Sequence, residues 1–271
     1  MSTADFDKDK AKAFSAKVLT DLAGCVTTRM CAIGDKLGLF TDLYQNGPAD
    51  SAAFAARTDI DERYAREWLQ GMTAAGYLVV NDDTLEYALP AEHAAPLAQP
   101  TSPLFQGGTW ELLTHSLAPF DELVDAFKNG GGVAQAHFHP NLYQGMRRSS
   151  GLRYTNFLLH RWLPTMPDVV AKLHAGADVA DIGCGSGTAI LTMAKEFENS
   201  TFVGYDLFAP QVEAANAEAR KQGMDKRVRF EVMDGAANLP RDFDIITTFD
   251  VIHDMAHPSE AIRNIYRHLK P

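Results

Sequence analysis

The chain contains few cysteines and no long apolar segment. It has 271 residues and three cysteines, and no two of these form a C-x-x-C pair. An odd number of widely spaced cysteines argues against a disulfide framework or a structural zinc site, and it favours a reducing compartment. No run reaches the roughly 18 apolar residues of a membrane-spanning helix, and the N-terminus lacks the apolar core of a signal peptide. We therefore expect a soluble, cytoplasmic protein with no membrane partner.

Positive charge is also scarce. The chain has 25 Lys and Arg against 35 Asp and Glu, which gives a formal net charge of −10. An acidic chain binds polyanions poorly unless it gathers its basic residues into one patch. The hydrophobic fraction of 46% and the charged fraction of 22% are typical of a globular protein with one large or two modest domains.

The first 95 residues predict a mostly helical domain. Apolar residues recur at helical spacing from residue 8 to about residue 42, which indicates one long helix and one short helix. A short helix at 51–57 and a longer helix at 61–75 follow. The apolar stripe of the longer helix is predicted to consist of Tyr64, Ala65, Trp68, Leu69 and Met72. Two β-rich runs, YLVV and LEYAL, flank the turn sequence NDDT and should pair as a hairpin. Helices followed by a hairpin in this order are typical of a winged helix-turn-helix domain.

The charge of this domain argues against DNA recognition. Residues 1–95 contain nine Lys and Arg and fifteen Asp and Glu, and the predicted recognition helix carries two arginines and three acids. DNA binding requires side chains that neutralise phosphates. We therefore expect no nucleic-acid partner. A transcriptional regulator whose C-terminal domain only senses a nucleoside stays open as an alternative.

Residues 96–165 are predicted to form a helical linker. A segment rich in Pro, Gly and Ser precedes two helical stretches at about 109–128 and 141–163. The loop between them, NGGGVAQAHFHP, contains His137 and His139. Alternating histidines can bind a metal, but a loop that covers a pocket can contain them equally well. The sequence therefore leaves their role open.

From residue 166 onward the apolar pattern changes to that of a sheet. Four short β-rich runs, VADIG, TFVGYD, VRFEVMD and DIITTFD, alternate with helical patterns at about 187–198, 209–222 and 258–269. Strands that alternate with helices form a parallel sheet with helices on both faces. The fold class that we expect is therefore α/β, with a Rossmann-like, doubly wound parallel sheet.

A glycine-rich loop, DIGCGSG, follows the first of these runs and opens a helix. Its glycines are Gly183, Gly185 and Gly187, and they allow backbone N–H groups to approach a ligand. The dinucleotide fingerprint G-x-G-x-x-G is not met, because its third glycine position is Thr188. Asp181 would also repel a pyrophosphate, whereas it would suit a ligand that carries an ammonium and a sulfonium. The loop thus argues against NAD.

Two further acids follow the next two strands. Asp206 ends the second run and can accept hydrogen bonds from both hydroxyls of a ribose. Asp234 ends the third run and can accept the exocyclic amine of adenine, with Met233 or Gly235 against the ring. The three strand ends together indicate a site for an adenosyl ligand.

With these motifs in this order, residues 168–271 resemble the class I S-adenosylmethionine-dependent methyltransferases. The preceding winged helix and helical linker resemble the layout of dimeric small-molecule O-methyltransferases. The resemblance implies three regions, which are a winged-helix dimerisation domain at 1–95, a linker that caps the substrate at 96–165, and a cofactor-binding domain at 166–271. It implies S-adenosyl-L-methionine as cofactor, S-adenosyl-L-homocysteine as product, a small-molecule methyl acceptor and a homodimer. The cofactor-binding residues that we expect from it are Asp181, Gly183, Cys184, Gly185, Gly187, Asp206, Leu207, Met233, Asp234, Gly235, Phe249, Asp250 and Tyr154.

The stretch FDVIHDMAHP after the fourth run contains the expected catalytic pair. In the O-methyltransferases that the chain resembles, a His-Asp pair follows the fourth strand, and its histidine deprotonates the acceptor hydroxyl. His253 is accordingly expected to be the general base, with Asp254 as the residue that orients it. The sequence departs from the plant enzymes at Met255, where they usually carry Trp. The acceptor is expected to be a hydroxyl of a partly aromatic compound, and methyl transfer to nitrogen or carbon stays open.

Two remaining expectations concern His257 and the end of the chain. Pro258 disfavours helical geometry at His257, so this histidine should begin a helix rather than pair with His253 on a metal. In the family a fifth parallel strand and an antiparallel pair follow the fourth strand, and they would lie beyond residue 271. We therefore expect the fourth strand to form an edge, and we expect the chain to be a fragment that is poorly active or prone to aggregate.

Overall fold

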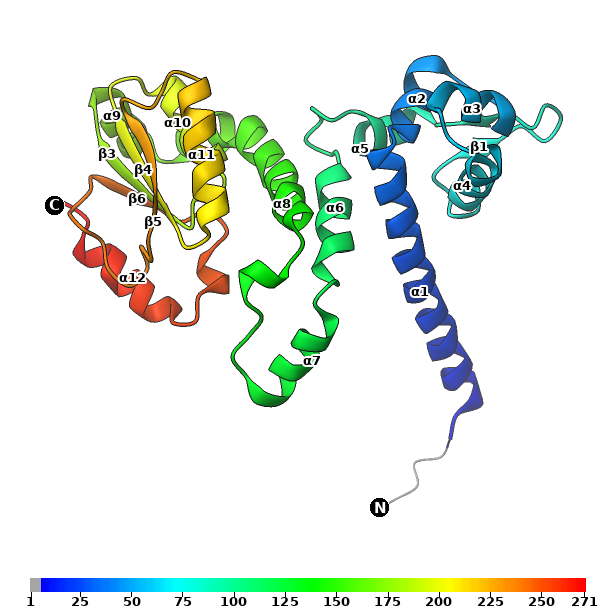
Figure 1. Cartoon of the computed structure of the whole chain (residues 1–271), viewed down its shortest axis with the longest axis horizontal. Helices are drawn as coiled ribbons and strands as arrows, with labels where there is room; N and C mark the ends of the chain where they lie inside the picture. The colour runs from blue at the N-terminus through cyan, green and yellow to red at the C-terminus, as the bar shows by residue number, and fades with distance from the viewer. Residues whose placement is uncertain (1–5) are drawn as a thin grey trace. The chain divides into compact units, whose positions relative to one another are not determined.

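The computed structural model describes residues 6–271, and Figure 1 shows the course of the chain. The chain divides into two compact units. The first contains the described residues up to Gly132 together with Phe138–Gly145, and the second contains Val133–His137 together with Met146–Pro271. None of the helices in the described part of the chain is long and apolar enough to span a membrane.

The first unit begins with the winged-helix order that the sequence predicts. Its elements are α1 (Lys8–Lys36), α2 (Leu39–Asn46), α3 (Ser51–Thr58), α4 (Glu62–Ala74), β1 (Val79–Val80), β2 (Tyr87–Ala88), η1 (Ala91–His93) and α5 (Ala94–Ala98). Gly38 lies between α1 and α2 and caps the start of α2 with a φ of 71°, a left-handed conformation that glycine adopts readily. The strands β1 and β2 pair antiparallel, with Val79 opposite Ala88, so the predicted hairpin is confirmed.

Trp68 on α4 lies at the centre of this core. Its ring meets Phe40 edge-on at 4.9 Å and stacks on Phe54 at 5.9 Å, and its indole N–H donates to the carbonyl of Met30 at 2.9 Å. The predicted apolar stripe of α4 is correct except at Tyr64, whose side chain is 73% exposed. The prediction fails at Tyr64 because the i, i+3, i+4 and i+7 positions that face the core are already filled by Ala65, Trp68, Leu69 and Met72.

The long helix α1 has the predicted apolar period, but much of that face is exposed in the described part of the chain. Phe14 is 67% exposed, Leu22 is 59% exposed and Val26 is 64% exposed. The opposite side of the same helix meets the core, because Cys31 and Gly34 are buried. The structure therefore leaves an apolar stripe open along α1.

The linker region consists of more and shorter helices than the sequence predicts. Its elements are α6 (Gly107–Ser116), α7 (Phe120–Asn129), η2 (Gln135–His137), α8 (Pro140–Arg153), η3 (Tyr154–Trp162) and η4 (Leu163–Thr165). The single helix expected at 109–128 is wrong, because the chain breaks before Pro119, whose ring lacks an N–H donor. The helix expected at 141–163 exists, but its last nine residues, η3, are wound as a π-helix.

The second unit contains the predicted parallel sheet. Its strands are β3 (Asp178–Ile182), β4 (Thr201–Asp206), β5 (Val228–Val232) and β6 (Ile245–Thr247), and its helical elements are α9 (Pro167–Ala175), α10 (Thr188–Glu196), α11 (Ala209–Lys221), η5 (Ile252–Asp254) and α12 (Pro258–Arg267). The strand order is β5-β4-β3-β6 and every pairing is parallel. Within the described sheet β6 is an edge strand, as expected.

Helices cover both faces of this sheet (Figure 1). Alternate strand residues point to opposite faces, so Val179 and Phe202 pack with α10 and α11 on one side. Ala180 and Val203 point to the other side, where Ile265 of α12 packs against the second core. The Rossmann-like α/β class is therefore confirmed, and all four strands direct their carboxyl ends to one edge.

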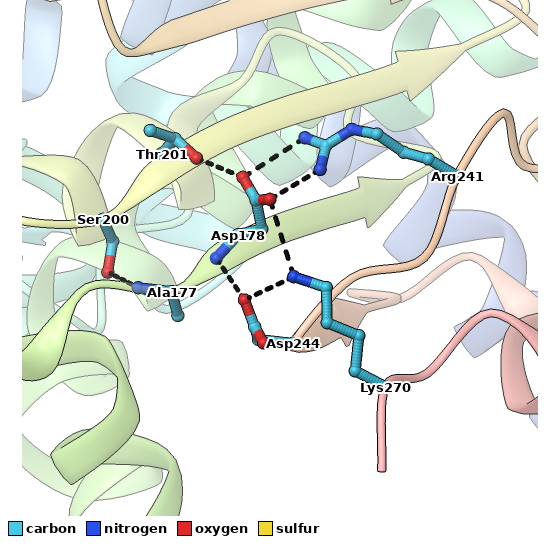
Figure 2. Close-up of polar contacts among 7 residues, drawn as sticks. All are labelled: Ala177, Asp178, Ser200, Thr201, Arg241, Asp244 and Lys270. Carbon is cyan, nitrogen blue, oxygen red and sulfur yellow. Dashed lines mark hydrogen bonds and ion pairs between the residues drawn. The ribbon is translucent and has the colours of Figure 1, made fainter.

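An ion-pair network joins the amino ends of the strands (Figure 2). Asp178 at the start of β3 accepts hydrogen bonds from both terminal nitrogens of Arg241, at 2.6 and 3.2 Å. Thr201 at the start of β4 donates to the same carboxylate, while Lys270 lies 3.1 Å from the carboxylate of Asp244. The backbone N–H of Asp178 also donates to Asp244 at 2.8 Å. The hydrogen bonds from Arg241 are the main reason that the pKa of Asp178 falls to about 2.

We predict that Asp178→Asn lowers the free energy of unfolding by about 1 kcal/mol at pH 7, a modest loss because the partners are partly exposed. The folded-state pKa lies below the ordinary value of 3.8. The contribution is therefore present above that value and is lost as the pH falls toward the folded pKa. Urea unfolding at pH 7 and near pH 2.5 measures both effects. Asp82→Asn, in the exposed hairpin turn, is the control, and equal stabilities of the Asp178 variant and the wild type at pH 7 would contradict the prediction.

Candidate functional site

The glycine loop after β3 has a backbone that only glycines adopt without strain. Gly183, Gly185 and Gly187 have φ values of 70°, 52° and 76°. A Cβ atom at Gly183 would overlap the side chain of Val251, and one at Gly187 would overlap the ring of Phe230. The N–H of Gly183 donates to the carbonyl of Tyr205 at 2.8 Å, so the loop is held against the end of β4.

The carboxylate of Asp206, at the end of β4, is bonded to this loop. Its Oδ2 accepts a hydrogen bond from the N–H of Gly185 at 2.8 Å, and its Oδ1 accepts one from the N–H of Phe208 at 2.8 Å. Each carboxylate oxygen has two lone pairs, so both oxygens retain acceptor capacity. The two amide donors fix the orientation of the carboxylate, which borders the cavity described next.

A cavity of about 330 Å³ lies at the carboxyl ends of β3, β4 and β5. It is lined by Gln135, Ile182, Gly183, Tyr205, Asp206, Leu207, Met233, Asp234, Gly235, Ala236, Ala237, Val251, Asp254, Met255, Ala256, His257, Glu260 and Ala261. Asp234 Oδ1 accepts from the N–H groups of Ala236 and Ala237, both at 3.1 Å. Asp206, Leu207, Met233, Asp234 and Gly235, which the sequence marked, therefore meet around one space.

Seven of the thirteen residues expected to bind the cofactor do not line this cavity, namely Asp181, Cys184, Gly185, Gly187, Phe249, Asp250 and Tyr154. The side chain of Asp181 is buried under the loop, where Thr247 Oγ1 donates to it at 2.8 Å. Burial, opposed by that hydrogen bond and reinforced by the charge of Asp206, raises the pKa of Asp181 to about 7. The thiol of Cys184 is buried beside Gly204, and burial raises its pKa as well. Cys184 therefore packs the loop onto the sheet, and only its backbone is available to a ligand.

A second set of residues gathers beside Asp181. The ring of Tyr154, on η3, lies 5.5 Å from Phe249, which follows β6. Burial is the main cause that raises the pKa of Tyr154 to about 12, and the charge of Asp181 adds to it. These contacts place Tyr154 and Phe249, both expected at the site, in one aromatic wall.

Asp250 and Arg153 form an ion pair next to this wall. Arg153 Nη2 lies 3.3 Å from Asp250 Oδ2, and Asp250 has a φ of 57°, which is uncommon outside glycine. The sequence marked Asp250 but missed Arg153. No local pattern could identify Arg153, because its partner lies 97 positions further along the chain.

His253 lies between two carboxylates at the end of β6. It belongs to the short helix η5, and its side chain is exposed. Its Nε2 is 3.3 Å from Asp254 Oδ1, and its Nδ1 is 3.8 Å from Asp250 Oδ1. His257 immediately precedes α12, whose first residue is Pro258, so its expected place at a helix start is confirmed. Among the described residues, no group of three His, Cys, Asp or Glu side chains could hold a metal.

Two family models match the chain. The model described as "Methyltransferase domain" matches residues 180–271, which contain the glycine loop, Asp206, Asp234 and His253. The model described as "Rv2258c-like winged HTH domain" matches residues 25–99. The winged-helix model thus matches within the predicted N-terminal domain, and the methyltransferase model matches within the predicted C-terminal domain.

Curated relatives match over about a hundred residues. A ubiquinone biosynthesis O-methyltransferase from Pseudomonas putida (strain W619) is 32% identical over 98 residues, which cover 36% of this chain and 41% of the relative. A 27-O-demethylrifamycin SV methyltransferase from Amycolatopsis mediterranei (strain S699) is 38% identical over 103 residues, which cover 36% of this chain and 37% of the relative. The chain thus spans about two fifths of the length of such relatives.

Solved structures match the fold over nearly the whole chain. The mitomycin 7-O-methyltransferase MmcR is similar with a TM-score of 0.70 at 20% identity, over 97% of this chain and 79% of that chain. Human N-acetylserotonin methyltransferase in complex with SAM is similar with a TM-score of 0.61 at 21% identity, over 100% of this chain and 79% of that chain. Residues 180–271 are therefore similar to a methyltransferase domain and residues 25–99 to an Rv2258c-like winged helix-turn-helix domain, and the chain shares the fold of these solved structures.

Proposed function

We propose that the protein transfers a methyl group from S-adenosylmethionine to a hydroxyl of a small, partly aromatic molecule. The observation that carries this proposal is the carboxylate of Asp206, held by the N–H of Gly185 and bordering the same cavity as Asp234. Two acids at the ends of the neighbouring strands β4 and β5, beside the glycine loop that follows β3, suit the hydroxyls and amine of an adenosyl group. Several of the similar solved structures are complexes with S-adenosylmethionine or S-adenosylhomocysteine, which supports this cofactor.

The residues present fit the adenosyl part of the cofactor. Asp206 has acceptor capacity left for ribose hydroxyls, because each of its oxygens accepts only one backbone N–H. Asp234 uses Oδ1 for two backbone N–H groups, which leaves Oδ2 for an exocyclic amine. Met233 and Gly235 line the same cavity and offer apolar contact to a flat ring. The backbone of the loop at Gly183 and Gly185 can approach the ligand closely, because no Cβ intervenes.

The residues around Tyr154 fit the other end of the cofactor. S-adenosylmethionine carries a methyl group activated by its sulfonium, together with an ammonium and a carboxylate. Arg153 is a cation that is ion-paired with Asp250, and it suits a carboxylate if it shares that ion pair. Asp181 and Asp250 supply negative charge for the cationic groups. Tyr154 and Phe249 form an aromatic wall that excludes water from the reacting atoms.

His253 is proposed to remove the proton of the acceptor hydroxyl. It is exposed at the carboxyl end of β6, so an acceptor can reach its ring. Asp254 Oδ1 lies 3.3 Å from Nε2, so this carboxylate can accept the ring N–H and orient the imidazole. Asp250 Oδ1 lies 3.8 Å from Nδ1, which is beyond hydrogen-bond distance. The protein then has two tasks, which are to align the acceptor with the methyl group and to take its proton.

A homodimer through the first unit is also proposed, and the open apolar stripe of α1 supports it. Phe14, Leu22 and Val26 lie on one side of a 29-residue helix and are more than half exposed. A contiguous exposed apolar surface of this kind marks an interaction site. A second copy of the same helix offers the same stripe, so the two can cover each other about a two-fold axis.

The experiment that tests the proposed reaction separates binding from transfer. We predict that His253→Ala lowers methyl transfer by roughly 100-fold, the lower end of the range for general-base catalysis, without changing the affinity for S-adenosylhomocysteine by more than about twofold. Transfer is measured as S-adenosylhomocysteine released with a panel of small phenols and catechols, and affinity by calorimetry. His174→Ala, on α9, is the matched control. An unchanged rate in His253→Ala would remove the base assignment, and no transfer by the wild type to any hydroxyl acceptor would contradict the proposed reaction.

The dimer is tested by replacing one apolar residue of the stripe with a charged residue. We predict that wild-type protein sediments with twice the chain mass of 29.7 kDa, and that Leu22→Glu sediments as a monomer. A buried glutamate at the interface would have to lose its hydration without a partner. The control is Thr20→Glu, which lies about 160° away around the helix at 100° per residue. A wild-type monomer, or a dimer that survives Leu22→Glu, would contradict the interface.

A further inference from the structure

A second cavity lies at the opposite end of the sheet from the glycine loop. It has a volume of about 440 Å³ at the amino ends of β3, β4 and β5, and all of its lining residues belong to the second unit. Its charged lining residues comprise four cations and two acids, namely Lys226, Arg227, Arg229 and Arg241 against Asp178 and Asp225. An excess of cations around one cavity is unexpected in a chain whose formal net charge is −10.

The register of the strands brings part of this charge to one face of the sheet. Asp178 is paired with Thr201, and the residue two places further along β4 is paired with Arg229. Paired residues and alternate residues of a strand point to the same face, so Asp178, Thr201 and Arg229 share it. Lys226 lies in the turn before β5, and Arg241 reaches Asp178 from the segment before β6 (Figure 2). The cavity therefore gathers cations from a turn, a strand and a distant loop.

Two of the four cations keep unused hydrogen-bond donors. Arg229 donates from Nε to Glu231 Oε1 at 2.7 Å, while its two terminal nitrogens, which carry four N–H groups, contact no acceptor among the described residues. The ammonium of Lys226 forms no hydrogen bond or ion pair within residues 6–271, and its side chain is exposed. Both groups can therefore bind a ligand without breaking a bond in the chain.

The other two cations are held in place by bonds within the chain. Arg241 donates to Asp178 through both terminal nitrogens, at 2.6 and 3.2 Å (Figure 2). Arg227 donates to two backbone carbonyls at the C-terminal end of α10. The carboxylate of Asp178 is thereby neutralised, so Asp225 is the lining acid that would still repel an anion.

These donors suit a phosphate group. A guanidinium presents its N–H groups in one plane and can bind two phosphate oxygens at once, and an ammonium adds a compact positive charge. A phosphate dianion has acceptor oxygens on every side, so it can meet Arg229 and Lys226 together. The volume of the cavity also leaves room for a small organic group on the phosphate.

We propose that this cavity binds a phosphate group, with Arg229 and Lys226 as its principal ligands and Arg241 beside them. The phosphate is either free or carried by a small molecule, and the same donors recognise both. The site lies at the amino ends of the strands whose carboxyl ends border the adenosyl cavity, so it is distinct from that cavity. It is also independent of the proposed methyl transfer.

The first test is a titration of the isotopically labelled full chain with inorganic phosphate, followed through the NMR shifts of its backbone amides. At pH 7 and constant ionic strength, the amides of residues 225–229 should shift with saturation. The expected dissociation constant is roughly 1 mM, which corresponds to two hydrogen bonds to charged groups. Sodium chloride at the same ionic strength should give no saturable shift. Phenyl phosphate, which adds an organic group to the same dianion, is titrated in parallel.

The second test uses single substitutions at the cavity. Arg229→Gln and Lys226→Gln should each weaken phosphate binding roughly fivefold, because each removes a charged donor from a partly exposed site. Asp225→Asn should strengthen binding about twofold, because it removes the repelling charge. A loss of folded protein could not imitate this gain.

Two cations in the first unit serve as matched controls. Arg66 on α4 also pairs with a nearby glutamate, Glu62, and its side chain is 49% exposed, compared with 52% for Arg229. Lys128 on α7 is exposed like Lys226. Arg66→Gln and Lys128→Gln should bind phosphate like the wild type.

The outcomes are distinct. Equal or lower affinity for phenyl phosphate would identify the free anion as the ligand, and a higher affinity would identify a phosphorylated molecule. The absence of saturable shifts with both probes would overturn the proposal, and so would wild-type affinity in both Arg229→Gln and Lys226→Gln. Neither failure would bear on methyl transfer, which is proposed at the carboxyl ends of the strands.

Discussion

The hydrogen bond from the N–H of Gly185 to the carboxylate of Asp206 joins the two central strand ends on which the rest of the site depends. It requires a loop that turns back over β3, and the left-handed glycines permit that turn. It also requires β3 and β4 to be adjacent and in register, which the pairing of Ile182 with Tyr205 provides. Once this bond forms, the glycine loop and Asp206 have fixed positions, and the cavity opens beside them toward Asp234.

The charges of the sheet are arranged differently at its two edges. At the amino ends, Asp178 and Asp244 are matched by Arg241 and Lys270, so those acids are neutralised within the chain. At the carboxyl ends the acids outnumber the cations. Asp181 has a threonine donor rather than a cation, and burial therefore raises its pKa. An edge with more acids than cations is suited to a ligand that supplies positive charge.

Local sequence patterns predicted the parts of the protein that depend on short-range rules. The glycine loop, the acids at the ends of β4 and β5, and the start of α12 at Pro258 follow from residues close together in the chain. Errors arose where packing or distant residues decide. Tyr64 has an apolar ring at the edge of a helical stripe, and Pro119 divides a helix that hydrophobic spacing alone would continue.

The residues that sequence reasoning missed are those that reach the site from elsewhere. Arg153 meets Asp250 across 97 positions, and Gln135 reaches the cavity from a segment between two helices. Neither belongs to a motif, because each acquires its place only through the tertiary fold. Conversely, one residue inside a motif does not direct its side chain to the site. Cys184 lies in the middle of the loop motif, yet its side chain points into the sheet and packs beside Gly204.

The most direct test of the account is calorimetry of S-adenosylmethionine binding at pH 7 in two buffers with different ionisation enthalpies. With a folded-state pKa of about 7, Asp181 is partly protonated, and a bound sulfonium and ammonium favour its charged form. The account predicts that binding releases a proton, that Asp181→Asn abolishes the release, and that S-adenosylhomocysteine, which lacks the sulfonium charge, releases less. Binding with a heat that is the same in both buffers, or no binding, would contradict it.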